Sequence, residues 1–250
     1  MRTATDVVDE LRRHADQREH AKTTRRMVGV PLSVVGVRMG TVFAVAKEHR
    51  ALPLPEVAAL LERDEYESRM VGVSVLDFRA RAPRLDDDGR QALYDVWMDH
   101  LDRMVAWDLV DRSAPRVVGL HLRSRSRDPL FTLAASPDVM HRRAAVVASF
   151  ALIRERDLDD PLAICGLLAG DRDPLVQSPI GTALREVGRV DAARRDAFLA
   201  THAAVISAAA RRVARGSGEA SVAGVDAFPT FPPVTRHTIT FDDVMARRDD

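Results

Sequence analysis

Residues 136–156 read Ser136-Pro-Asp-Val-Met140-His-Arg-Arg-Ala-Ala-Val-Val-Ala-Ser-Phe150-Ala-Leu-Ile-Arg-Glu-Arg156. Ser136 and Pro137 suit the N-cap and the first turn of a helix, because the N–H that proline lacks would be unpaired there anyway. The apolar run Ala144–Ile153 that follows is far shorter than the roughly 20 residues that span a bilayer. The stretch therefore predicts a helix over residues 138–156 and no membrane span.

Helical periodicity continues through nearly every segment up to about residue 215, and no stretch shows the alternation expected of a strand. The class is predicted to be all-α. Proline, glycine and acidic clusters divide this region into helices with short connections. The predicted helices cover residues 5–26, 38–50, 55–63, 65–81, 86–103, 106–123, 138–156, 159–170 and 174–190.

Short connections between helices of similar length favour antiparallel neighbours, so the succession indicates stacked helix pairs or an irregular bundle. The pairs recur at roughly the 35 to 45 residues of HEAT-like repeats, although no consensus sequence repeats with them. Residues 1–215 are expected to form this helical domain. From Gly216 the chain becomes rich in Gly, Ser and Pro, which predicts an irregular C-terminal tail over residues 216–250.

Composition excludes several classes of function. The 250 residues carry 37 basic and 37 acidic side chains, so the formal net charge is zero. The protein as a whole is therefore not attracted electrostatically to nucleic acid or to anionic lipid. Cys165 is the only cysteine, and no His-x-x-x-His spacing, phosphate-binding loop or serine-hydrolase motif is present. Neither a metal nor an organic cofactor is expected. The charged N-terminus does not resemble a signal peptide, which predicts a cytoplasmic protein.

The densest chemical signal is Trp107-Asp-Leu-Val-Asp111. On a helix, Trp107 and Asp111 lie four residues apart and share a face, while Asp108 points elsewhere. A carboxylate is then presented beside an aromatic wall. The structural alternative is a core Trp with an Asp on the surface one turn later.

Arginines recur in successive helix pairs. If the corresponding helices line one concave side, their guanidiniums form a track for a phosphate backbone. The alternative is that each one is solvated or paired with a nearby carboxylate. The arginines in question are Arg69, Arg112, Arg143 and Arg185.

Three blocks of sequence resemble, in order and spacing, the AlkD family of DNA alkylpurine glycosylases over roughly residues 20–205. The resemblance implies a right-handed superhelical solenoid of HEAT-like antiparallel helix pairs, with a concave basic groove that grips double-stranded DNA. The stretches Val35-Gly36-Val37 and Glu65-Tyr66 also fit. The three blocks are Trp107-Asp-Leu-Val-Asp111-Arg-Ser-Ala-Pro115, His141-Arg-Arg143-Ala-Ala-Val146 and Asp173-Pro-Leu-Val-Gln177-Ser-Pro-Ile-Gly181-Thr-Ala-Leu-Arg185-Glu-Val-Gly188.

Members of this family excise purines alkylated at N3 or N7, and they do so without extruding the nucleotide, unlike most glycosylases. The resemblance implies that Asp111 is the catalytic carboxylate and that Trp107 contacts the deoxyribose of the lesion. It also implies that Arg143 holds the DNA backbone, with Arg185 as a further phosphate contact. No cofactor is implied.

The chemistry agrees with these roles. An alkylated purine is already cationic, so it leaves without a general acid, and a carboxylate near C1′ stabilises the positive charge that develops on the sugar. Removing such an electrostatic element costs on the order of a hundredfold to a thousandfold in rate. An indole face adds roughly 0.5 to 2 kcal/mol. This role requires the carboxylate of Asp111 to face the substrate and not the protein interior.

The chain departs from the family pattern at three positions. Thr182 stands where family members commonly have a second Trp, and Met27 stands where many have an aromatic residue, so the wall around the lesion is thinner. Either the grip on small methyl lesions is weaker, or a bulky adduct has more room, as in glycosylases that protect producers of DNA-alkylating antibiotics. Pro179 lies where a helix interior is expected, which predicts a kink or a restart capped by Ser178.

The leading hypothesis is a monomeric, nucleoid-associated DNA repair glycosylase for cationic alkylpurines in double-stranded DNA. A rival hypothesis is a non-catalytic relative that binds branched or distorted DNA. Loss of Trp at position 182 favours the rival, whereas retention of Trp107 and Asp111 opposes it, because pure binding gains nothing from a carboxylate that faces phosphates. A helical-repeat scaffold for a protein partner is the third alternative.

Overall fold

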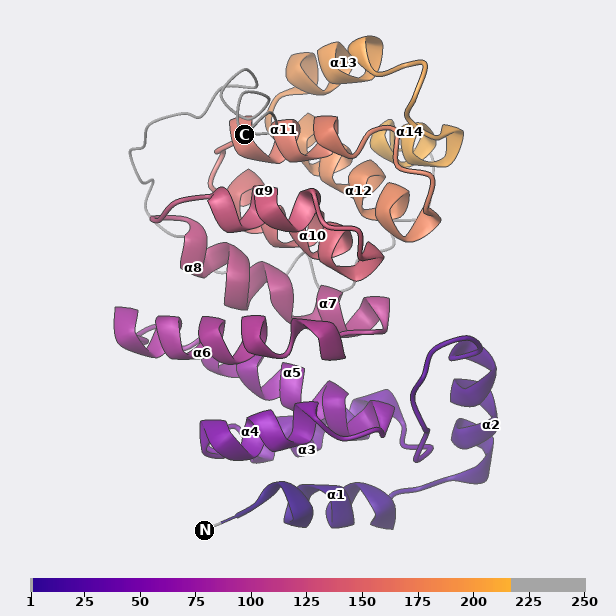
Figure 1. Cartoon of the computed structure of the whole chain (residues 1–250), viewed down its shortest axis with the longest axis vertical. Helices are drawn as coiled ribbons and strands as arrows, with labels where there is room; N and C mark the ends of the chain where they lie inside the picture. Colours follow the sequence, from indigo (N-terminus) through magenta and orange to yellow (C-terminus); the bar gives the residue numbers. More distant parts are fainter. Residues whose placement is uncertain (1, 217–250) are drawn as a thin grey trace. The chain divides into compact units, whose positions relative to one another are not determined.

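The structure is a computed structural model that describes residues 2–216 (Figure 1). The predicted C-terminal tail, from residue 217 onward, lies outside the described residues. Within residues 2–216 the regular structure is helical, and the one bridge between extended residues joins Ser33 to Glu65. The all-α class is therefore confirmed. None of the helices in this part of the chain has both the length and the apolar character needed to cross a bilayer.

The chain divides into two compact units, Met1–Ser113 and the part from Ala114 onward. The helices up to this boundary are α1 (Ala4–Arg13), α2 (Gln17–Arg26), α3 (Met39–Glu48), α4 (Leu54–Leu61), α5 (Tyr66–Ala80), α6 (Asp87–Asp99), the 3-10 helix η1 (Leu101–Arg103) and α7 (Trp107–Ala114). Those after it are the π-helix η2 (Pro115–Gly119), α8 (Leu120–Leu122), α9 (Asp128–Ala134), α10 (Val139–Arg154), α11 (Asp159–Leu167), α12 (Pro174–Val190), α13 (Ala192–Thr201) and α14 (Ala208–Ala214).

Helix α5 is the central helix of the first unit. It is buried without interruption from Tyr66 to Asp77, and it packs against α3, α4 and α6. A helix that is buried on all sides lies in the interior of its unit, so its polar side chains must find partners inside the protein. Buried Glu67, Arg69 and Asp77 meet this requirement and connect α5 to other segments of the unit.

Helix α10 has the corresponding role in the second unit. It is buried from Arg143 to Ile153 and packs against η2, α9, α11 and α12. The helix predicted over residues 138–156 is therefore confirmed, but its N-cap is not Ser136. Asp138 caps it, because its carboxylate accepts hydrogen bonds from the backbone N–H groups of Met140 and His141. Ser136 accepts instead from the N–H of Asp138.

Helix α12 confirms the prediction of a helix over residues 174–190. Asp173 caps it by accepting a hydrogen bond from the N–H of Leu175 at 2.8 Å. The predicted restart capped by Ser178 is wrong, because α12 runs through Pro179 without a break. A proline inside a helix has no N–H for the carbonyl four residues earlier, here that of Leu175. Arg143 supplies a hydrogen bond to this carbonyl from α10.

A further prediction of helix boundaries is wrong. The segment 5–26 forms two helices, because the carboxylate of Asp16 accepts hydrogen bonds from the N–H groups of Arg18 and Glu19 and so begins α2. Helix α9, which carries Pro129 in its first turn, was not predicted. Helices α13 and α14, which begin after the capping residues Asp191 and Ser207, were also not predicted.

Candidate functional site

Helix α7 carries the predicted catalytic pair. Its first residue, Trp107, is partly exposed, whereas Asp111 is 2% exposed. The structural alternative of a core Trp with a surface Asp is therefore wrong, since the burial is the reverse. A buried carboxylate is tolerated only with partners, and Asp111 is engaged in a polar interaction within the protein. The free protein thus holds this carboxylate in its interior, contrary to the orientation that the catalytic role requires.

Arg143, the predicted backbone contact, lies on α10 in the second unit and is 1% exposed. Its Nη1 donates a hydrogen bond to the carbonyl of Leu175 on α12. In the free protein this guanidinium therefore joins two packed helices. Its predicted contact with DNA stays a prediction.

Arg112, on α7, is held by several groups of the first unit. Its Nη2 lies 3.1 Å from Oδ2 of Asp77, and its Nε donates to the hydroxyl of Ser74 at 3.0 Å. The guanidinium carbon lies 4.6 Å from the ring centre of Phe43 and 4.9 Å from that of Phe78. Burial lowers the pKa of Arg112, and the charge of Asp77 opposes this shift. These contacts stabilise the unit.

Arg69, on α5, is buried, whereas Arg112 is partly exposed. Its Nη1 donates to the carbonyl of Arg103 at 2.7 Å, and its Nε donates to the carbonyl of Arg63. Burial lowers the pKa of this guanidinium. A phosphate reaches Arg69 or Arg112 only if these internal bonds break, so the predicted arginine track gains no support from these two residues.

Arg185, on α12, is less enclosed than the other three arginines. Its side chain is about one-fifth exposed, and Nη2 lies 3.5 Å from Oε1 of Glu186. The Nε group is buried and has no hydrogen-bond partner in the described part of the chain. The Nε–H of Arg185 is thus a donor that no described residue accepts, and the predicted contact of Arg185 with phosphate stays a prediction.

Thr182 and Met27, the predicted walls of the lesion pocket, are both buried. The Thr182 hydroxyl donates to the carbonyl of Ser178 within α12 at 3.4 Å. Met27 is the C-cap residue directly after α2, and its N–H donates to the carbonyl of Thr23 at 2.9 Å. Their role at a lesion stays a prediction.

Sequence reasoning missed a cluster that lies next to two of these residues. Arg26 precedes Met27, Asp108 follows Trp107, and Tyr66 is the first residue of α5. Arg26 Nη1 and the Tyr66 hydroxyl both donate to Oδ2 of Asp108, at 2.5 and 2.7 Å. Arg26 Nη2 donates to the Tyr66 oxygen at 2.7 Å. Asp108 thus points to its own partners, as its helix position predicts.

The surroundings shift the pKa values of Tyr66 and Arg26 in this cluster. Burial, together with the nearby charge of Asp108, raises the pKa of Tyr66 far above its usual value, so the hydroxyl stays protonated. Burial opposes the charge on Arg26, but the bonds to Tyr66 and Asp108 outweigh it and raise the pKa of Arg26. The cluster is therefore a neutral phenol between a guanidinium and a carboxylate.

A buried carboxylate on α5 fixes the loop after α2. Glu67 accepts hydrogen bonds from the backbone N–H groups of Val35, Gly36 and Val37 at 2.9, 2.9 and 3.2 Å. Gly36 has a φ of 92°, and a Cβ there would lie 2.6 Å from Cβ of His20. The conformation requires glycine, and this explains the Val-Gly-Val sequence that the family resemblance singled out.

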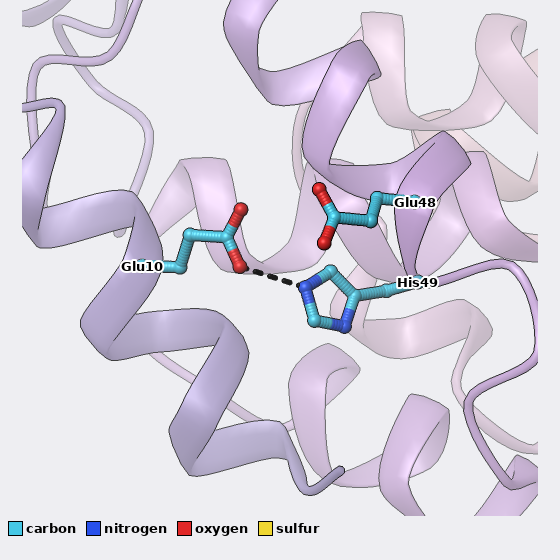
Figure 2. Close-up of side chains that lie close together, drawn as sticks. All are labelled: Glu10, Glu48 and His49. Carbon is cyan, nitrogen blue, oxygen red and sulfur yellow. Dashed lines mark hydrogen bonds and ion pairs between the residues drawn. The ribbon is translucent and has the colours of Figure 1, made fainter.

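One group of metal-ligand side chains occurs among residues 2–216. Figure 2 shows Glu10, Glu48 and His49, whose ligand atoms lie within 4.8 Å of one another beside a cavity of about 610 Å³. His49 Nε2 lies 2.8 Å from Oε2 of Glu10. Arg2 Nη1 lies 3.0 Å from both Glu48 Oε1 and His49 Nε2. Arg2 thus pairs with both carboxylates of this group.

Comparison with known proteins relates this chain to a protein family and to a solved structure. A model of the family described as DNA alkylation repair enzyme matches residues 7–216. A solved structure, described as a predicted DNA alkylation repair enzyme from Enterococcus faecalis, superposes with a TM-score of 0.62 at 17% sequence identity. The match covers 80% of this chain and 95% of that chain, and at this identity it concerns the fold. No curated protein sequence matches the chain.

Proposed function

Because the chain belongs to the DNA alkylation repair enzyme family, we propose that it hydrolyses the N-glycosyl bond of alkylated purines in double-stranded DNA. The observation that carries the proposal is the pair on α7, where the indole of Trp107 and the carboxylate of Asp111 lie one helical turn apart on a shared helix face, inside the matched region.

The proposed reaction is a displacement at C1′ of the deoxyribose. The bond from C1′ to the purine nitrogen breaks, and the cationic purine leaves as a neutral base with the bonding electron pair. Positive charge develops on the sugar, where the carboxylate of Asp111 stabilises it, assisted by the indole face of Trp107. A water oxygen then bonds to C1′ and loses its proton, which leaves an abasic site.

The burial of Asp111 adds a step to this scheme. The carboxylate is 2% exposed in the free protein, so it must exchange its present interaction for the sugar when DNA binds. Arg143 is 1% exposed and faces the same requirement before it contacts the backbone. We therefore propose that the catalytic arrangement forms only in the DNA complex, together with the phosphate contacts of Arg185.

The proposed substrates are purines with bulky N3 or N7 adducts, as in self-resistance to a DNA-alkylating natural product. The support is that Thr182 and Met27 are smaller than the aromatic residues common at these positions. Both residues are buried in the free protein, so the space for an adduct also has to form on binding.

Release of base from defined duplexes tests the proposal. The wild type should produce abasic sites in a duplex with N7-methylguanine or with a bulky N7 adduct. Asp111→Asn should be slower by about a hundredfold to a thousandfold. Asp99→Asn is a matched control, because Asp99 is an exposed carboxylate at the end of α6 and its loss should leave the rate unchanged. Equal rates for wild type and Asp111→Asn would refute the catalytic role.

A non-catalytic DNA-binding protein is the second candidate, and the burial of Asp111 favours it. A carboxylate that keeps its internal partners in the DNA complex stabilises the fold and does no chemistry. Salt-dependent binding of DNA, with no base released from any lesion, would select this candidate. Absence of DNA binding would point to a scaffold for a protein partner.

A further inference from the structure

We infer that one face of helix α2 binds the phosphate backbone of duplex DNA, and that Tyr66 and Asp108 hold its last residue, Arg26, in position for this contact. The inference rests on the proposed function only in taking DNA as the partner. It does not depend on base release.

Helix α2 is unusually basic for a protein without net charge. Its ten residues, Gln17–Arg26, include four basic side chains and one acidic side chain, Glu19. Arg18, Lys22 and Arg26 follow at intervals of four residues, so they share a face at steps of about 6 Å along the axis. All three are exposed. This face complements a row of phosphates.

The exposed face at the end of α2 is cationic even though Arg26 pairs with Asp108. The Arg26 side chain is 40% exposed and that of Asp108 is 14% exposed. Asp108 Oδ1 is buried and has no hydrogen-bond partner in the described part of the chain. The carboxylate is therefore less accessible than the guanidinium, which favours contact of an approaching phosphate with the N–H groups.

Arg26 has N–H groups that the cluster does not use. A guanidinium carries five N–H bonds, and two of those of Arg26 are directed at Asp108 and Tyr66. No other hydrogen bond from Arg26 to the described residues is present, in contrast to buried Arg69 and partly buried Arg112. The remaining N–H groups suit the paired oxygens of a phosphate.

The cluster also fixes the guanidinium in advance. A free arginine side chain loses rotamer entropy when it is immobilised. Each member of the cluster bonds to the other two, because the protonated Tyr66 hydroxyl donates to Asp108 while its oxygen accepts from Arg26. The plane of the guanidinium is thereby set before DNA arrives. Tyr66 and Asp108 act as positioning residues.

The salt dependence of binding to an unmodified duplex oligonucleotide tests this inference. Each phosphate contact contributes about 0.9 to the slope of log affinity against log salt concentration. Arg26→Gln should lower the slope by about one and weaken binding roughly threefold to tenfold. Arg50→Gln removes the same charge from an exposed position outside α2, and its slope should equal that of the wild type.

A second variant separates positioning from charge. Tyr66→Phe keeps the cation but loses the bond that orients it, so the affinity should fall while the slope stays the same. Thermal unfolding of each variant identifies any loss that comes from the fold.

Each remaining outcome has one meaning. If the wild type binds DNA and Arg26→Gln has the same slope of log affinity against log salt concentration, the inference is overturned. The proposed glycosylase activity is not affected by that result. A reduced slope for Arg26→Gln without base release by the wild type supports the inference and overturns the glycosylase. No salt-dependent binding of DNA by the wild type overturns both.

Discussion

Arg143, on α10, donates a hydrogen bond to the carbonyl of Leu175, the acceptor that Pro179 leaves without its helical donor in α12. A buried polar group without a partner costs about 1–3 kcal/mol, so the guanidinium and the proline compensate for each other. Two features that are unusual on their own, a buried arginine and a proline inside a helix, therefore form one arrangement.

The first prediction is that Arg143 and Pro179 are energetically coupled. Pro179→Ala restores a helical N–H to the Leu175 carbonyl, so Arg143→Ala should destabilise the protein less in that background than in the wild type. The difference should be about 1 kcal/mol or more in the free energy of unfolding, measured in urea for wild type, both single variants and the double variant. Additive effects within about 0.5 kcal/mol would show that the two residues act independently.

The second prediction concerns the close contact between η2 and α10. A Cβ at Gly119 would lie 2.2 Å from the carbonyl oxygen of Ala148, and this backbone atom has no room to move. Gly119→Ala should destabilise the protein by about 1–3 kcal/mol or more. Gly40→Ala is the control, because a Cβ there meets nothing within 4 Å and alanine favours the helix by roughly 0.5–1 kcal/mol. Chemical denaturation of both variants should give changes of opposite sign.

The third prediction concerns Glu67, whose carboxylate accepts the three N–H groups of residues 35–37. Glu67→Gln removes the negative charge. It also places the NH₂ group of the glutamine, a donor, opposite backbone N–H groups that are donors themselves. The cost should be about 2–4 kcal/mol in the free energy of unfolding, because bonds to a charged acceptor are the stronger kind. Glu62→Gln, at an exposed carboxylate, should cost less than about 1 kcal/mol. A small effect at Glu67 would mean that the loop holds its conformation without this residue.

The fourth prediction concerns pH. Burial raises the pKa of the Cys165 thiol from 9.0 to about 12. The neutral thiol is thus favoured in the folded state, and its contribution to stability is complete below pH 9 and is lost as the pH rises toward 12. The free energy of unfolding of the wild type should fall more steeply above pH 9 than that of Cys165→Ala. The comparison isolates the thiol, because Tyr66 titrates in both proteins. Parallel curves would show that the thiol ionises equally in both states.

Much of the fold followed from the sequence. Helices α10 and α12 were predicted to within two residues at each end, because apolar residues at helical spacing continue through both. The boundary at Asp16 was missed because a capping carboxylate is hard to recognise among charged residues. Helix α9 was missed because it is short and has Pro129 in its first turn, and proline both ends helices and suits their first turn.

The candidate site was less predictable, for a physical reason. The spacing of Trp107 and Asp111 fixed their shared face, but burial depends on what packs against that face. The same limit hid the internal bonds of Arg112. The cluster of Arg26, Tyr66 and Asp108 joins segments that are 40 and 42 residues apart. A local sequence pattern does not predict contacts over such separations.

Helix α2 buries only Thr23 among its ten residues, whereas α5 is buried almost throughout. Little apolar surface holds α2 in place, and Arg26 and the loop that Glu67 holds bind it to α5. Local opening is least costly where few apolar contacts are lost. The amide hydrogens of α2 should therefore exchange with solvent long before those of α5, through local opening that leaves the core of its unit intact.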